Sequence, residues 1–338
     1  MRDAERYTTL DGMRGLAALC VVAFHLGQHL PLPRTAGFLA VDFFFLLSGF
    51  VLGLAYDARL RTDLTLKTFV GMRIARLYPY IFLGAFLAVA RGIAAKFLGA
   101  PESLSADTLL IGGLLGFLLI PMPFAGFPMF LNVPAWSLLY EFAVNMAYGG
   151  SKTFRTGWVL MLIVASSALV LAILSMANGT LNGGYTLSEW PIATSRVLFS
   201  FCLGVLISRN RERLRLPRVS GLIPSVSLTI ILLTPSFGIV YELLFVFLAS
   251  PLILVVGMNA RPFFGATYLG EISYPVYATH FSLISLGGAA GGLLGIPVAL
   301  SAFAAVAAFS MLVPMIQRHY DIPLRRLIHR SIVAKNKI

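Results

Sequence analysis

Several ionisable side chains lie inside apolar stretches of the sequence, where a charge is costly and commonly functional. The stretch 13–30 holds Arg14 and His25. They lie about 16 Å apart along a helix, so Arg14 would sit at one membrane edge and His25 past the midplane. A histidine can act as a general base near neutral pH. The alternatives are a snorkelling anchor for Arg14 and a hydrogen bond to a neighbouring helix for His25.

Two carboxylates fall in other apolar stretches. Asp42 enters the stretch 38–56 from the side on which His25 would lie, and Glu141 lies about one turn into the stretch 135–149. A carboxylate at that depth could fix the imidazole tautomer, as in hydrolase triads. Asp42 could instead cap a helix at the outer interface. We therefore predict a catalytic group of His25, Asp42 and Glu141.

Arg73 and Arg76 are three residues apart, which places both guanidinium groups on one face of a helical turn. Paired guanidinium groups suit phosphates because each can donate two parallel hydrogen bonds. Together with Arg14 they form the predicted site for an anionic co-substrate. The alternative is that all three are basic anchors at the membrane edge.

Four further side chains would lie in the outer half of the bundle. Ser137 shares a helix face with Glu141, and Tyr277 shares one with His280. Trp136 suits a substrate contact or an aromatic belt. The predicted substrate-binding residues are thus Trp136, Ser137, Tyr277 and His280. No metal-ligand cluster with a recognisable spacing occurs in the sequence, so no metal site is predicted.

The elements that position these residues are membrane helices. The chain has 338 residues, of which 58% are hydrophobic and 12% charged, whereas soluble domains carry about 25% charged residues. Its apolar runs are continuous and about 20 residues long, which favours helices over a barrel. The predicted fold is an all-α polytopic membrane bundle of about ten transmembrane helices, forming a single domain over residues 1–338. The predicted spans are 13–30, 38–56, 77–95, 135–149, 157–177, 194–208, 220–237, 239–258, 266–286 and 295–317.

The charges predict the orientation. Basic residues cluster in 57–76, 150–156 and 209–218, whereas 178–192 has no Lys or Arg. The net charge of +12 thus follows the positive-inside rule and requires no nucleic acid. Both termini would be cytoplasmic, at a bacterial inner membrane. The loops 57–76 and 121–134 would lie on opposite sides of the membrane, so only one full crossing, 77–95, fits between them. We therefore expect the apolar piece 107–121 to be re-entrant or interfacial.

The motifs, taken in order, resemble the acyltransferase 3 family of integral-membrane acyltransferases. The resemblance covers almost the whole chain. It rests on Leu10-Asp11-Gly12-Met13-Arg14-Gly15 with His25, Val41-Asp42-Phe43-Phe44-Phe45, Arg73-Ile74-Ala75-Arg76, Trp136-Ser137 with Glu141, Ser273-Tyr274-Pro275 with His280, and Pro323-Leu324-Arg325-Arg326. The family implies ten spans and transfer of an acyl group, usually acetyl, from acyl-coenzyme A to cell-surface carbohydrates, lipids or antibiotics. It also implies functional roles for Arg14, His25, Arg73 and Arg76.

The residues and the resemblance leave three functions open, the last of which is a binding or sensing protein that has lost catalysis. The first is an acyltransferase that takes acetyl-CoA or another acyl-CoA as co-substrate and modifies a hydroxyl of a carbohydrate or lipid-linked glycan, with membrane lipids as its surroundings. The second is a proton-coupled transporter that uses the same intramembrane histidines and carboxylates as a relay. The sequence has no paired Gly- or Pro-broken spans in matching halves, which disfavours the transporter.

Overall fold

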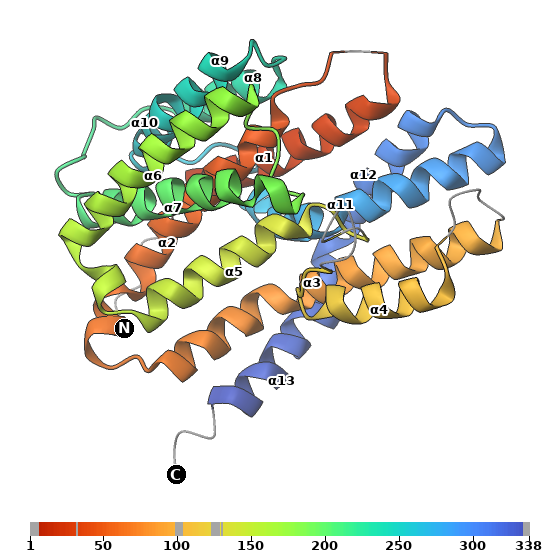
Figure 1. The fold of residues 1–338 in the computed structure, drawn as a ribbon, viewed down its shortest axis with the longest axis horizontal. Helices are drawn as coiled ribbons and strands as arrows, with labels where there is room; N and C mark the ends of the chain where they lie inside the picture. The colour runs from red at the N-terminus through yellow and green to blue at the C-terminus, as the bar shows by residue number, and fades with distance from the viewer. Residues whose placement is uncertain (1–6, 32, 99–103, 123–128, 130, 334–338) are drawn as a thin grey trace.

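The chain folds into a bundle of helices (Figure 1). A computed structural model describes residues 7–31, 33–98, 104–122, 129 and 131–333, and no β-strand occurs among them. The α-helices are α1 Thr8–Leu26, α2 Ala40–Thr62, α3 Leu66–Phe97, α4 Ala106–Phe117, α5 Ala135–Gly150, α6 Gly157–Asn178, α7 Trp190–Arg209, α8 Leu222–Leu233, α9 Ile239–Leu244, α10 Ser250–Met258, α11 Ala266–Leu294, α12 Val298–Ile316 and α13 Ile322–Val333. The predicted all-α bundle is confirmed.

Each of the ten predicted spans is helical, but some of these helices are too short or too polar to cross a membrane by themselves. In the described part of the chain, seven helices are long and apolar enough to span a membrane. Helix α5 has 16 residues and α8 has 12, or about 24 and 18 Å. Helix α11 has 29 residues but is not among the seven, because polar residues and glycines interrupt it.

Helix α4 lies beside α3 (Figure 1) and carries most of the apolar piece 107–121. Its 12 residues reach about 18 Å, which is well short of a hydrocarbon core of about 30 Å. The length agrees with the prediction that this piece does not cross by itself. The residues 66–76, predicted to be a loop, are instead the first turns of α3, so Arg73 and Arg76 sit on a long helix.

Glycines let two pairs of helices approach closely. A Cβ added at Gly15 of α1 would collide with the backbone of Leu269 in α11. One added at Gly49 of α2 would collide with the carbonyl oxygen of Phe201 in α7. Small residues permit such contacts in lipid, where dispersion forces and hydrogen bonds hold helices together. The Gly15 contact holds α1 against α11, the helix that carries Ser273 and His280, which contact Arg14 and His25.

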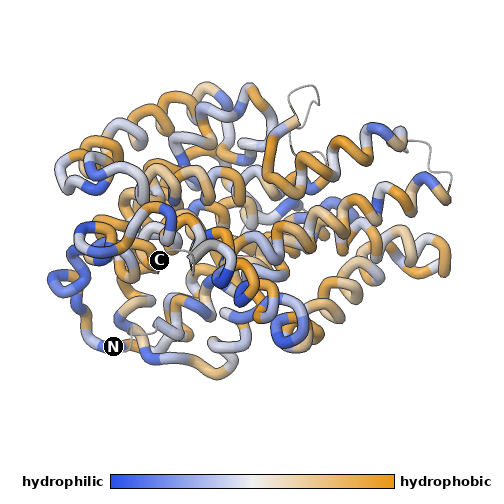
Figure 2. The backbone as a smooth tube through the Cα atoms, turned by 90° about the horizontal axis from the view of Figure 1, so that it is seen from below, coloured by the Kyte–Doolittle hydropathy of each residue, from blue (hydrophilic) through white to orange (hydrophobic). Residues whose placement is uncertain are grey.

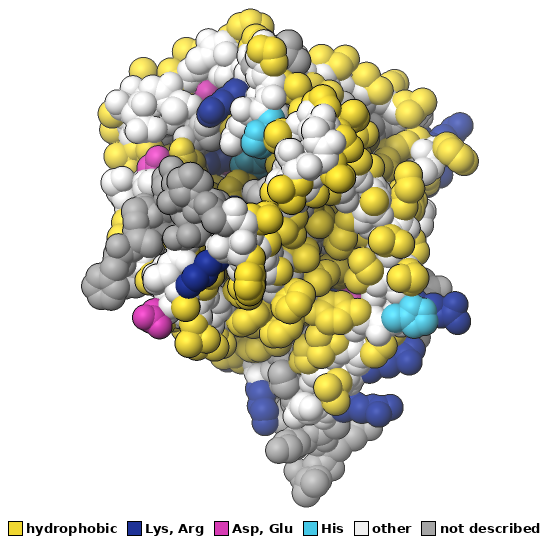
Figure 3. All heavy atoms as spheres, turned by 90° about the vertical axis from the view of Figure 1, so that its right-hand side faces the viewer, with side chains coloured by type: hydrophobic (Ala, Val, Ile, Leu, Met, Phe, Trp, Pro, Cys, Tyr) yellow, Lys and Arg dark blue, Asp and Glu magenta, His cyan; other side chains and the backbone are white. Residues whose placement is uncertain are grey.

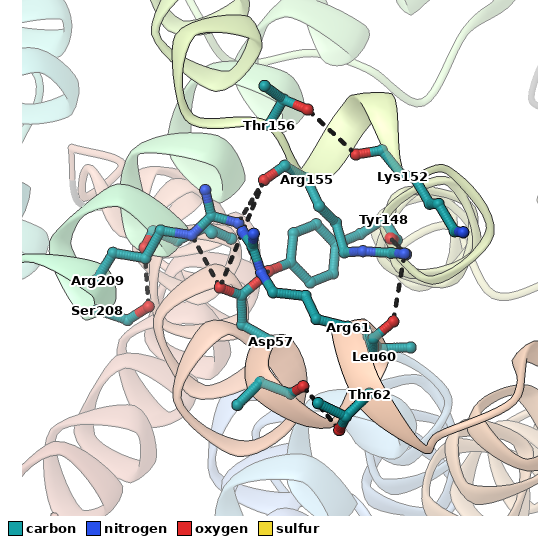
Figure 4. A network of polar contacts seen from close by, with 12 residues as sticks. Asp57, Leu60, Arg61, Thr62, Tyr148, Lys152, Arg155, Thr156, Ser208 and Arg209 are labelled. Atoms are coloured by element: carbon teal, nitrogen blue, oxygen red, sulfur yellow. Dashed lines mark hydrogen bonds and ion pairs between the residues drawn. The ribbon is translucent and has the colours of Figure 1, made fainter.

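Polar residues gather at the end of the bundle where several basic segments meet (Figure 2). Asp57 at the end of α2 accepts hydrogen bonds from Arg209 at 2.8 and 3.0 Å and from Tyr148 at 2.5 Å. Arg61 and Arg209 both donate to the carbonyl oxygen of Arg155 (Figure 4). The loops after α2, α5 and α7 therefore lie on the same side, as their basic charge predicts.

A second set of contacts joins loops at the other ends of these helices. The buried carboxylate of Glu242 accepts hydrogen bonds from the Thr180 hydroxyl at 3.1 Å and from the Leu181 amide at 2.5 Å. The Ala36 amide donates to the carbonyl oxygen of Thr234 at 2.9 Å. The loops after α1, α6 and α8 are thereby held together, opposite the Asp57 contacts.

This arrangement predicts which engineered cysteines react from which side of the membrane. Lys152→Cys and Asn210→Cys should be labelled by an impermeant maleimide from one side, and Ser188→Cys from the other, because the helices between them cross the bundle. The native Cys20 and Cys202 are buried and supply the unreactive background. Labelling of all three positions from one side in sealed vesicles would contradict the arrangement.

Candidate active site

A cavity of about 510 Å³ lies among α1, α2, α3, α5, α11 and α13. Its wall includes all three arginines predicted to hold an anion, together with Glu141, Ser137 and Tyr277. His25, Asp42, Trp136 and His280 do not line it. The predicted co-substrate residues therefore share one chamber, whereas the predicted catalytic residues do not.

Arg14 is fixed by polar groups of α11 and of its own helix. Its Nε donates to the Ser273 hydroxyl at 2.9 Å and its Nη2 donates to the Gly270 carbonyl at 3.4 Å. Asp11, one turn earlier, pairs with Nη2 at 3.2 Å. With a quarter of its side chain exposed, Arg14 is held at the cavity wall and remains accessible.

Arg73 and Glu141 form an ion pair deep in the cavity, with Nη2 3.4 Å from Oε1. The Arg73 side chain is 2% exposed, and its Nε has no hydrogen-bond partner. The same Glu141 oxygen also accepts a hydrogen bond from Ser48 at 3.1 Å. Arg73 thus lines the cavity and has one buried donor that no described residue satisfies.

Two hydroxyl groups meet on the cavity wall. Ser137 and Tyr277 are joined by a hydrogen bond of 2.6 Å, and the Ser137 hydroxyl also lies 2.9 Å from the Pro134 carbonyl. Glu141 lies one turn along α5 from Ser137, so the hydroxyl pair and the ion pair are neighbours, as their shared helix face predicted.

Beyond Tyr277 lie two histidines in contact. The His280 ring centroid is 5.8 Å from that of Tyr277 and 5.1 Å from that of His25. His280 is fully buried: Nδ1 lies 2.8 Å from the Tyr277 carbonyl oxygen, and Nε2 has no hydrogen-bond partner. His25 is partly exposed, and its Nδ1 lies 3.3 Å from the Gln28 amide. Figure 3 shows histidine side chains in a hollow of the face turned toward the viewer.

The predicted contact of Asp42 with His25 is not present in the structure. Both Asp42 oxygens accept hydrogen bonds from Arg196 of α7, at 3.0 and 2.6 Å, and the two side chains are 0% and 1% exposed. Arg196 also donates to the carbonyls of Leu181 and Gly183 and lies over the Trp136 ring. A buried carboxylate pairs with the strongest donor available, so Asp42 and Trp136 belong to this cluster. Glu141 likewise contacts Arg73 rather than His25.

Arg196 is not among the predicted site residues, although it is an ionisable residue inside a predicted span and the same criterion selects it. Gln28, Arg325 and His329 are not among them either. The last two reach the cavity from α13, and only the packing of α13 on α3 reveals that position.

These features define a class of protein: an integral-membrane helix bundle with an arginine-lined cavity and an intramembrane histidine pair. Residues 7–316 match the acyltransferase domain of the acyltransferase 3 family, and the chain belongs to that family of enzymes. The expected resemblance is thereby confirmed, and the acyltransferase is favoured over the transporter.

Three curated relatives are similar to parts of the chain. Protein 2 in the picA locus of Rhizobium radiobacter is 37% identical over 50% of this chain and 94% of the relative. The acyltransferase MdmB of Streptomyces mycarofaciens is 36% identical over 42% of this chain and 38% of the relative. The exopolysaccharide production protein ExoZ of Rhizobium meliloti is 25% identical over 84% of this chain and 88% of the relative. No solved structure matches the chain.

The Asp42–Arg196 contact predicts a loss of stability on substitution. Asp42→Ala should lower the free energy of unfolding by about 3–5 kcal/mol, because the Arg196 charge would remain buried without its partner. Denaturant unfolding of the purified protein in detergent measures this loss. The double variant Asp42→Leu/Arg196→Met removes both charges and should recover much of it. Unchanged stability combined with lost turnover would instead give Asp42 the catalytic role that its position in the sequence suggested.

Proposed function

We propose that this enzyme transfers an acyl group, most simply acetyl, from cytoplasmic acyl-coenzyme A to a hydroxyl group presented at the other side of the membrane. One observation carries the proposal. An arginine-lined cavity reaches the Ser137–Tyr277 hydroxyl pair, and the His25–His280 pair lies directly beyond it. The acyl donor and the acceptor would approach this point from opposite sides.

The donor side has the chemistry that a coenzyme A ester requires. Its phosphates would meet the guanidinium groups of Arg14, Arg73 and Arg76, which all line the cavity. We propose that Glu141 positions Arg73 through their ion pair rather than acting on the acceptor. The apolar wall around Phe44, Phe45 and Leu138 suits an uncharged pantetheine arm.

The transfer itself requires a base next to the acceptor hydroxyl. His25 would take the hydroxyl proton while that oxygen forms its bond to the thioester carbonyl carbon. The carbon–sulfur bond then breaks, and the sulfur leaves as a thiolate that regains the proton from the imidazolium group. His280 would position the His25 ring from behind, and the Tyr277 hydroxyl would turn from Ser137 to donate a hydrogen bond to the developing oxyanion.

The acceptor class is a carbohydrate or a lipid-linked glycan. Support comes from ExoZ, whose name places it in exopolysaccharide production and which is aligned over most of its length. We further propose that the protein lies in a bacterial inner membrane with the Asp57 end in the cytoplasm, since the basic loops gather there.

The donor site predicts a binding defect for two single variants. Arg73→Ala or Arg76→Ala should raise the KM for acyl-coenzyme A about ten- to a hundred-fold, because each removes charge-assisted hydrogen bonds. Lysine retains the charge but not the planar fork, so Arg→Lys should rescue only in part. Arg213→Ala is the matched control, since Arg213 is an exposed arginine away from the cavity. Normal KM values in both alanine variants would make these arginines membrane anchors.

The proposed role of His25 as the general base predicts that its removal slows turnover. His25→Ala should lower kcat about 10²- to 10⁴-fold, the usual contribution of acid–base catalysis, while acyl-coenzyme A binding changes little. Turnover and donor binding are measured in parallel at matched expression.

His29→Ala is the control for this experiment. His29 lies four residues along the chain, is exposed, and ends the short helical turn Gly27–His29, so its loss should be mild. Near-normal kcat in His25→Ala would exclude His25 as the base.

A further inference from the structure

Helix α13 contributes two basic side chains to the wall of the arginine-lined cavity. It follows α12 through a π-helical turn, Gln317–Asp321, and packs on α3 (Figure 1). Arg325 and His329 lie four residues apart on one face, and both line the cavity. Neighbouring Arg326 does not line it. The helix therefore contributes two selected side chains to the cavity rather than a general basic surface.

Side-chain contacts of the π-helical turn hold α13 in this place. The Tyr320 hydroxyl donates to the Pro79 carbonyl of α3 at 2.7 Å. The Gln317 amide donates to the Glu271 carbonyl of α11 at 3.1 Å. Pro275 has no N–H to satisfy that carbonyl four residues earlier, so α11 leaves it available for Gln317.

Asp321 then sets the direction of the Arg325 side chain. The buried Asp321 carboxylate accepts a hydrogen bond from Arg325 Nε at 2.6 Å. The terminal nitrogens of Arg325 make no hydrogen bond to the described residues. One side of the guanidinium group is thus fixed, and the other is available to a ligand.

The cationic groups of the cavity differ in depth. The side chain of Arg73 is 2% exposed and that of Arg14 is 26% exposed, whereas that of Arg325 is 39% exposed. Arg325 is thus the most exposed of these three arginines, and His329, one turn farther along α13, is exposed as well. A coenzyme A ester has its anions in a corresponding order along its length, with the diphosphate nearer the thioester and the ribose 3′-phosphate at the nucleotide end.

We propose that Arg325 and His329 of α13 bind the ribose 3′-phosphate of the acyl donor, with Asp321 as a positioning residue. The inference rests on the proposed function, since it assigns one part of the donor site. It makes α13 a determinant of donor selectivity: the helix distinguishes coenzyme A from the same molecule without the 3′-phosphate.

The test compares binding of acetyl-coenzyme A and 3′-dephospho-acetyl-coenzyme A by isothermal titration calorimetry on the full chain in detergent. The wild type should bind the 3′-phosphorylated donor at least about tenfold more tightly, as expected for one charge-assisted contact. Arg325→Gln should lose most of this preference and bind the dephospho donor as the wild type does. Arg326→Gln, one residue away on another face, should keep the preference. His329→Ala, on the exposed part of α13, should reduce it.

Each outcome decides the inference. Equal wild-type affinity for the two donors would overturn it while leaving acyl-coenzyme A as the donor. Failure of the wild type to bind either donor would overturn both this inference and the proposed function. Equal losses for both donors in Arg325→Gln, with an unchanged preference in His329→Ala, would show that α13 supports the fold and does not read the 3′-phosphate.

Discussion

The free-energy cost of burying a charge in a medium of low polarity determines how the ionisable side chains of this protein are paired. A carboxylate or guanidinium group buried in a membrane bundle needs a counterion and hydrogen bonds. Asp42 and Arg196 meet this need completely, with two hydrogen bonds to each other and further carbonyls around the guanidinium group. Arg73 meets it only in part, because one donor is left unused beside a cavity. This difference separates the charges that hold the bundle together from those that are available to a ligand.

Helix α1 joins the arginine-lined cavity to the histidine pair, because it carries both Arg14 and His25. Glycines on α1 and α11 allow close contact, so Arg14 reaches the cavity while His25 meets His280 farther along the same helix. Polar contacts at the two ends, around Asp57 and around Glu242, hold the loops in place. The site therefore depends on helix packing within the bundle and on fixed loops at both ends.

In the proposed reaction, this arrangement would keep the two substrates apart until they react. The phosphates would stay at the basic end, while the thioester reaches the hydroxyl pair of Ser137 and Tyr277. His280 is fully buried, so a hydrogen bond to a developing charge beside it would be strengthened by the low polarity of its surroundings. Helix α13 adds Arg325 and His329 to the cavity wall, and under the proposal they would contact the far end of the donor.

The sequence by itself determined the helical membrane fold, the position of the ten apolar segments and three of the arginines that line the cavity, Arg14, Arg73 and Arg76. Composition and segment length decide these features, since lipid admits few backbone structures, and the Arg73–Arg76 spacing fixes their shared face. Only the tertiary structure decided the partners. Asp42 contacts Arg196 rather than His25, Glu141 contacts Arg73, and α13 returns over the cavity. Which charges meet depends on packing between helices that are far apart in the chain, and local spacing carries no information about it.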